Sequence, residues 1–137
     1  ANINAAGLHR VALAAYPQFK EALKAEDITH TNLVVVGAGA STRGRPMTLG
    51  FAAGKAAQRS VAQSLARAWD PEKIHVSYMI VDGLIDTVPA RSMMPKDTPD
   101  DFFLKTEDIA QVVYDITEQK PSAWTFEFDV RPFGEKW

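Results

Sequence analysis

The first long segment of the chain has apolar residues at intervals of three and four positions. In residues 7–26 these positions are Leu8, Val11, Ala12, Ala15, Phe19, Ala22 and Leu23. This spacing predicts an amphipathic helix with one face against a core. Pro17 lies inside the segment. Because proline lacks an amide hydrogen and clashes with the preceding turn, we expect it to kink or interrupt the helix.

Two apolar runs without alternation predict buried strands. They cover residues 32–37 (NLVVVG) and 73–83 (KIHVSYMIVDG), the second stopped by its Asp-Gly pair. Continuous apolar runs are typical of parallel strands that are covered on both faces. A glycine-rich loop (GAGASTRGRP) follows the first run, and a helix is predicted after it from about Leu49 to Trp69, ending before Pro71.

The rest of the chain predicts a long loop, a helix and a strand. Residues 84–104 contain Pro89, Pro95 and Pro99 and show no periodicity, which is typical of a lid or binding loop. We therefore predict a substrate loop there. Residues 105–120 predict a helix with Thr106 as its N-cap. Residues 124–130 (WTFEFDV) alternate between apolar and polar, which predicts a half-exposed strand near a sheet edge.

The order helix, strand, helix, strand, loop, helix, strand predicts an α/β fold with a parallel sheet and right-handed crossovers. Three strands make a poor sheet, however, because an unpaired apolar edge promotes aggregation. We therefore expect residues 1–137 to be a single segment of a larger doubly wound sheet. The missing strands would come from an upstream segment or from another chain.

Composition narrows the classes of function. The 137 residues are 46% hydrophobic and 23% charged with a formal net charge of −2, which is typical of a globular protein and favours neither nucleic-acid nor membrane-surface binding. The absence of cysteine excludes disulfides and thiolate chemistry and suggests a reducing cytoplasm. No apolar run reaches the roughly 18 residues that span a bilayer, and the start does not read as a signal peptide. Because an initiator Met is lacking, we expect a processed chain or a fragment.

The stretch GFAAGKAAQ (50–58) resembles a phosphate-binding loop but fails its pattern. Three residues instead of four separate Gly50 from Gly54, and Ala56 stands where a hydroxyl should hold magnesium. The small residues are better explained by close helix packing. Lys55 lies one turn after Phe51. From the residues alone, Lys55 is either a solvated lysine on an alanine-rich helix or part of a site.

Other candidate motifs are weaker. Gly37 and Gly39 follow a predicted strand, but Thr42 replaces the third glycine of the dinucleotide fingerprint. No fixed base accompanies Ser41, so a serine nucleophile is not supported.

The histidines and two aspartates of the chain suggest structural roles. The histidines are scattered, without the spacing of a metal site, and we interpret them as structural: His9, His30 and His75. Asp82 and Asp86 flank the start of a loop, which indicates turn capping more than catalysis.

Several segments, taken in order, resemble the C-terminal half of a short-chain dehydrogenase/reductase. They are NINAAG, NLVVVGAGAS…RG, FAAGKAAQRSVAQSLAR, IHVSYMIVDGLIDT, EDIAQVVYDITEQ and WTFEFDVRPFGEKW, and they cover essentially the whole chain. The resemblance is closest to a branch with an Arg-Pro…Glu-Lys-Trp tail, here Arg131-Pro132 and Glu135-Lys136-Trp137. It implies a Rossmann-like fold, whose first half supplies the missing strands and the nucleotide loop, and a cofactor that is NAD or NADP.

The resemblance also assigns site residues. Asn4 in INAAG matches the catalytic asparagine. Lys55 matches the lysine that grips the nicotinamide ribose and lowers the pKa of a catalytic tyrosine. Gly83, Ile85 and Thr87 match the stretch that contacts the nicotinamide.

The chain departs from the family pattern at catalytic positions. Phe51 stands where the tyrosine is expected, Ala38 stands where the serine is expected, and Asp82 replaces a proline. A phenyl ring and a methyl group can neither transfer a proton nor hydrogen-bond the substrate oxygen. These substitutions argue against ordinary carbonyl reduction more strongly than against nucleotide binding through Lys55 and Asn4.

These observations leave three hypotheses open. In the first, the chain belongs to an NAD(P)-dependent oxidoreductase, acting on a carbonyl or alcohol, in which Ser41, Thr42, Tyr78 or a water donates the proton. The alternatives are a non-catalytic nucleotide-binding or scaffolding relative and a bare fragment of a longer enzyme.

The resemblance also predicts partners. Helices near residues 5–25 and 50–69 pair with copies of themselves in the family, so we expect a homodimer or tetramer. Residues 86–104 either cover an apolar substrate or pack in the core, through Met93, Met94, Phe102 and Phe103.

Overall fold

The computed structural model describes residues 2–136, and Trp137 of the predicted tail lies outside them. The helices are η1 (Asn2–Ala6), α1 (Gly7–Ala22), η2 (Gly39–Ser41), α2 (Leu49–Trp69), η3 (Asp70–Glu72), α3 (Val88–Ser92), η4 (Asp100–Phe102), α4 (Thr106–Thr117) and η5 (Pro121–Ala123). The strands are β1 (Thr31–Ala38), β2 (Ile74–Val81), β3 (Leu84–Ile85), β4 (Phe103–Leu104) and β5 (Glu127–Val130).

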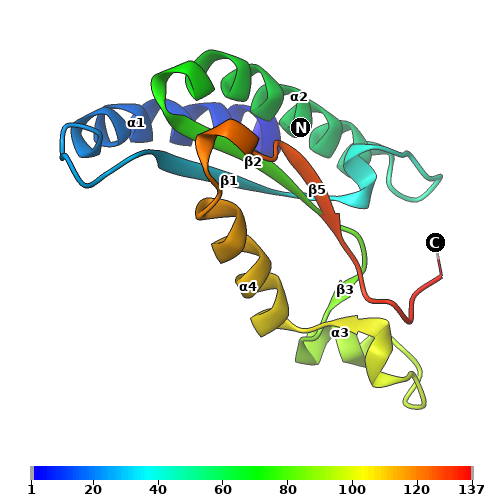
Figure 1. Ribbon diagram of the computed structural model, residues 1–137. Helices are drawn as coiled ribbons and strands as arrows, with labels where there is room; N and C mark the ends of the chain where they lie inside the picture. The colour runs from blue at the N-terminus through cyan, green and yellow to red at the C-terminus, as the bar shows by residue number, and fades with distance from the viewer. Residues whose placement is uncertain (1, 137) are drawn as a thin grey trace.

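A parallel sheet organises the molecule. Its strand order is β1-β2-β5, with Ala38 opposite Val81 and Tyr78 opposite Glu127. Helices α1 and α2 cover one face, and α4 lies on the other side (Figure 1). A small parallel ribbon of β3 and β4 extends beyond the carboxyl end of β2 and carries α3. The predicted α/β alternation and parallel sheet are confirmed.

The core lies between β2 and the two long helices. Every residue of β2 from Ile74 to Ile80 is buried, as its unbroken apolar run predicts. Ile74 packs with Ala12 of α1 and with Trp69 of α2. The ring of Tyr16 stacks on Trp69 at a centroid distance of 5.1 Å. These contacts fix α1 and α2 on one face of the sheet.

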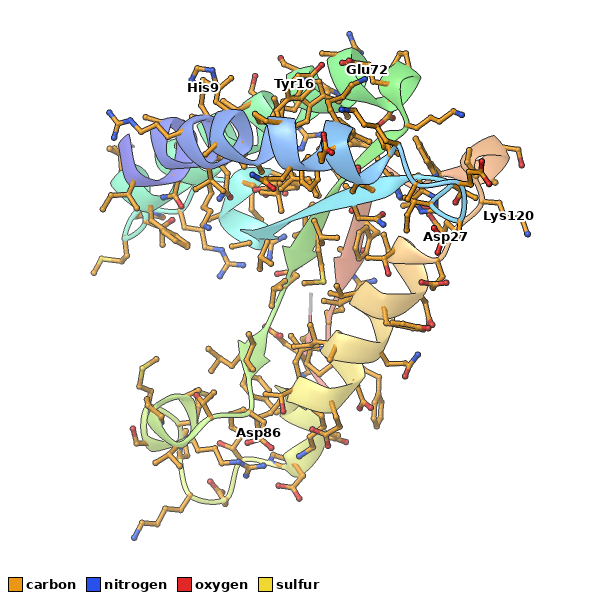
Figure 2. All side chains as sticks on the ribbon, turned by 90° about the vertical axis from the view of Figure 1, so that its left-hand side faces the viewer. His9, Tyr16, Asp27, Glu72, Asp86 and Lys120 are labelled. Atoms are coloured by element: carbon orange, nitrogen blue, oxygen red, sulfur yellow. The ribbon has the colours of Figure 1, made fainter. Side chains whose placement is uncertain are left out.

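The hydroxyl of Tyr16 donates to Glu72 Oε1 at 2.5 Å. Figure 2 shows these two side chains together at the top of the molecule. This bond ties α1 to η3, immediately after α2.

Several predictions about individual elements need correction. Helix α1 runs through Pro17 without interruption, because Pro17 and Leu13, the residue one turn earlier, lie on the exposed face, where water can hydrate the unpaired carbonyl. The N-cap of α4 is Lys105, and the Thr106 hydroxyl hydrogen-bonds Glu107 instead. Residues 84–104 are not irregular throughout, since they form β3, α3, η4 and β4.

Strand β1 is not covered on both faces as its apolar run predicted. Its burial alternates toward its end, and the side chain of Val36 is 52% exposed. Within residues 2–136 only β2 pairs with β1, so its other edge carries no strand. By contrast, the predicted half-exposed character of β5 is confirmed.

Candidate functional site

The carboxyl ends of β1 and β2 lie side by side. Ala38 ends β1 opposite Val81, which ends β2. In open parallel sheets, ligands bind in the crevice outside this edge. Helix α2 brings Lys55 toward it, with Nζ 3.5 Å from the carbonyl oxygen of Val36 and 3.3 Å from Gln58 Oε1.

Lys55 is a partly desolvated cation. Its side chain is half-buried, and burial lowers the pKa of its ammonium. The ring of Phe51, one helical turn earlier, lies with its centroid 5.9 Å from Nζ. An ammonium has three protons to donate, and the acceptors of Val36 and Gln58 engage two of them. The lysine therefore keeps a donor beside the exposed Phe51 ring.

A buried tyrosine lies beneath this lysine. Tyr78 of β2 is fully buried, and its hydroxyl lies 3.2 Å from Gln58 Oε1 and 3.3 Å from the carbonyl oxygen of Lys55. Burial raises the pKa of the Tyr78 phenol, and the neighbouring Ser41 side chain opposes that shift. Gln58 Oε1 thus accepts from both Lys55 and Tyr78, which fixes the amide between them.

The expected serine position is Ala38, which is extended and carries no hydroxyl. The Ser41 hydroxyl donates to the carbonyl oxygen of Ala38 at 2.5 Å, and Ser41 is 4% exposed. The Thr42 hydroxyl lies at the surface and donates to the carbonyl oxygen of Gly39 at 3.2 Å. Of the hydroxyls predicted as replacement proton donors, those of Ser41 and Tyr78 are buried.

The turn after β2 is tightly packed. Gly83 has φ +156°, and a Cβ there would lie 2.7 Å from Glu135 Oε2 and 2.8 Å from Pro132 Cδ, so a side chain is excluded. Ile85 lies in β3, and the Thr87 hydroxyl accepts the amide of Ala90 to cap α3. The C-terminal segment after β5 therefore backs the stretch that resembles a nicotinamide contact.

Asp82 and Asp86 form ion pairs and do not cap turns, which corrects the prediction from sequence. Asp82 accepts from Arg43, with 2.7 Å between Oδ1 and Nη2. Asp86, labelled in Figure 2 beside α3, accepts from Arg91 Nε at 2.5 Å and from Lys105 Nζ at 2.9 Å. Hydrogen bonds from Arg91 and Lys105 hold the pKa of Asp86 well below its usual range. These bonds close the predicted substrate loop at both ends.

Asn4 lies in the π-helical turn η1, which packs against α2. Such turns are rare and often occur at functional sites. Asn4 and Lys55 thus lie on packed elements, although no hydrogen bond joins their side chains in the part of the chain that the structure describes.

The histidines lie away from this edge and have structural partners where they are buried. His75 stacks on Trp124 with 4.6 Å between ring centroids, and its Nε2 donates to the carbonyl oxygen of Thr125 at 2.8 Å. His9 is exposed on α1 (Figure 2). Within residues 2–136 no cluster of three His, Cys, Asp or Glu residues is arranged to hold a metal ion. The same range contains no helix long and apolar enough to cross a membrane.

Comparison with known proteins identifies the fold. No protein-family model and no curated protein matches the chain. Among solved structures, a putative short-chain dehydrogenase/reductase from Burkholderia xenovorans is 26% identical with a TM-score of 0.74, over 94% of this chain and 51% of that one. The fold is that of a short-chain dehydrogenase/reductase.

Two further dehydrogenase structures are similar. A short-chain dehydrogenase from Rhodopseudomonas palustris is 32% identical with a TM-score of 0.56, over 77% of this chain and 40% of that one. An alcohol dehydrogenase from the archaeon Thermococcus sibiricus, complexed with 5-hydroxy-NADP, is 19% identical with a TM-score of 0.73, over 97% of this chain and 52% of that one. The chain thus spans about half the length of the dehydrogenases that it matches.

Within this dehydrogenase fold, sequence reasoning missed Gln58, Arg43 and Glu135. Gln58 lies three residues after Lys55, on the same face of α2, so helix spacing could have suggested it. The pair of Arg43 and Asp82 joins residues 39 positions apart and leaves no local signal. Glu135 approaches Gly83 only through the fold.

Proposed function

We propose that the chain is the C-terminal half of an NAD(P)-dependent oxidoreductase that transfers hydride between the cofactor and a carbonyl or alcohol substrate. The observation that carries this proposal is the position of Lys55. Its half-buried ammonium lies at the carboxyl edge of the parallel sheet with a donor to spare, in a fold shared with dehydrogenases.

The residues present suit one end of a nicotinamide dinucleotide. Lys55 brings a positive charge to the ribose end, and Gly83 allows the tight turn after β2 with φ +156°. Asn4, Ile85 and Thr87 complete the residues that we assign to this end, with Thr87 acting through the cap of α3. When bound, the cofactor would donate or accept the hydride. The related structures hold 5-hydroxy-NADP or NADH, so the choice between NAD and NADP stays open.

Phe51 and Ala38 favour a second candidate function, a nucleotide-binding relative without catalysis. The Phe51 ring is 51% exposed beside Lys55, where a phenol would supply a proton. Ala38 presents only a methyl group. The same two positions define the atypical branch that we propose for this chain.

Completion of the site needs a partner strand, and we propose that it comes from an upstream segment or another chain. The free edge of β1 and the half-length match to other dehydrogenases support this. We further propose a homodimer or tetramer through η1, α1 and α2. A groove of about 580 Å³ between these helices is lined by small and apolar residues, among them Ala5, Ala6, Val61 and Leu65. Intact mass and light scattering test the two proposals separately.

The decisive experiment combines binding with turnover. On the protein whose sheet is completed by the upstream segment or the other chain, calorimetry with NADH and NADPH measures binding, and a panel of ketones, aldehydes and alcohols measures turnover by absorbance. Binding with turnover supports the oxidoreductase, binding without turnover supports the non-catalytic relative, and absence of both contradicts the proposal. Phe51→Tyr should raise turnover, while the matched change Phe133→Tyr, at a side chain that is 90% exposed elsewhere, should not.

A further inference from the structure

At the candidate site, Lys55 differs from the hydroxyls because one of its protons has no protein acceptor within residues 2–136. The hydroxyls of Ser41 and Tyr78 belong to buried residues and point to protein acceptors. The Thr42 hydroxyl already donates its proton to the carbonyl oxygen of Gly39, and it is a weak acid without an adjacent base. Lys55 alone combines an unengaged N–H with a position at the sheet edge beside Phe51.

We propose that the ammonium of Lys55 exchanges the proton with the substrate oxygen, in place of the phenol that Phe51 lacks. This inference rests on the proposed oxidoreductase function and names its acid. In reduction, the carbonyl carbon gains the hydride of the reduced nicotinamide and the carbonyl oxygen gains a proton from Nζ. The products are an alcohol, the oxidised cofactor and a neutral Lys55 amine, which solvent reprotonates. In oxidation of the alcohol, the proton passes from the substrate hydroxyl to the neutral Lys55 amine.

The surroundings of Nζ suit this role. Burial lowers the pKa of the ammonium, which makes it a better acid than a solvated lysine. Its direct neighbours are uncharged at neutral pH: the Val36 carbonyl, the Gln58 amide and the Phe51 ring. Tyr78, reached through Gln58, stays neutral because burial raises its pKa.

The nearby charges are already paired. Arg59 of α2 is bound to Glu127 of β5, with 3.1 Å between Nη2 and Oε2. Arg43 after β1 is bound to Asp82 after β2. No carboxylate contacts Nζ in the described residues, so no neighbouring anion holds the proton on Lys55.

Lys55→Arg separates proton donation from charge. A guanidinium keeps the positive charge and its hydrogen bonds but does not release a proton at accessible pH. We expect this variant to bind NADPH or NADH within about threefold of the wild type, and to lose turnover by about 100-fold or more, the usual contribution of a general acid. Lys120→Arg, at an exposed lysine outside the candidate site and the substrate loop, is the matched control and should leave both unchanged.

Three further readouts test the same assignment, and the last of them needs no turnover. In the wild type, the rate of carbonyl reduction should fall tenfold per pH unit above the pKa of Lys55, and Phe51→Tyr in the Lys55→Arg background should restore part of the turnover. Amine-detected NMR of the nucleotide-free protein should show the Lys55 resonance titrating below the ordinary lysine value of about 10.4.

The outcomes distinguish the two proposals. A wild type that neither binds nucleotide nor turns over substrate overturns the proposed function and this inference with it. A wild type that turns over, beside a Lys55→Arg variant that binds nucleotide and keeps turnover within tenfold, overturns this inference alone. A Lys55 titration at or above the ordinary lysine value also overturns it.

Discussion

Removal of the Tyr78 hydroxyl tests the buried contacts that hold Lys55 in place. The hydroxyl has one proton and two acceptors within reach, Gln58 Oε1 at 3.2 Å and the Lys55 carbonyl oxygen at 3.3 Å. The hydroxyl can therefore donate to only one of these acceptors at a time. A net hydrogen bond contributes about 1 kcal/mol to the free energy of unfolding.

Neither acceptor loses its last donor in Tyr78→Phe. Gln58 Oε1 still accepts from Lys55 Nζ, and the Lys55 carbonyl still accepts an amide within α2. The penalty for an unpaired buried acceptor does not apply, so the expected loss stays near about 1 kcal/mol, or roughly 3–6 °C in Tm. Because Gln58 is then anchored from one side only, the NMR titration of the Lys55 amine should also shift.

Urea unfolding followed by tryptophan fluorescence measures this loss. The matched control is Tyr114→Phe on α4, where the tyrosine is 60% exposed, and the expected change there is within about 0.5 kcal/mol. A Tyr78→Phe protein as stable as the wild type would show that the hydroxyl makes no net hydrogen bond. A loss above about 3 kcal/mol would show that an acceptor is left unpaired, and would refute the shared arrangement around Gln58.

The remaining predictions concern the substrate loop, the core and the C-terminal segment. Asp86→Asn should speed proteolysis within residues 84–104 at pH 7, because Arg91 and Lys105 lose their shared carboxylate. The pKa of Asp86 is lower in the folded than in the unfolded protein. Its stabilising effect is therefore present above the unfolded pKa of about 3.9 and is lost only as the pH falls through the folded pKa. Protection of the wild-type loop against proteolysis should persist down to about pH 4. Ile74→Ala, at a side chain with no exposed surface, should cost about 2–5 kcal/mol in urea unfolding. Gly134→Ala places a methyl group 2.5 Å from Asp101 Oδ1 and should speed amide exchange at residues 83–87, whereas unchanged exchange would show that the C-terminal segment does not support that turn.

Local patterns predicted those elements whose surroundings lie within the chain. Helix α2 has the predicted ends because its amphipathic pattern and Pro71 both act locally. Strand β2 is buried as predicted because β1, β5 and the helices surround it. The run of β1 carries the same signal, yet its burial depends on a second neighbour that residues 2–136 do not include.

The candidate site was predictable only in its outline. The spacing of Phe51 and Lys55 on one helix, together with the family resemblance, predicted that the two side chains share a site, and the ring centroid lies 5.9 Å from Nζ. The pairs of Arg43 with Asp82 and of Asp86 with Lys105 were not predictable, because each joins residues that only the folded chain brings together. The local sequence indicated turn capping by Asp82 and Asp86, but each aspartate instead pairs with an oppositely charged side chain.

The strand that would pair with the free edge of β1 would also change the surroundings of Lys55. Lys55 Nζ donates to the carbonyl oxygen of Val36, whose side chain is 52% exposed, and the Phe51 ring beside Nζ is 51% exposed. Burial is the cause that lowers the pKa of Lys55. A strand paired along β1 would therefore remove further water from this corner and lower that pKa again. The segment that completes the sheet would also bring the ammonium closer to releasing its proton at neutral pH, so the full acidity of Lys55 belongs to the completed fold.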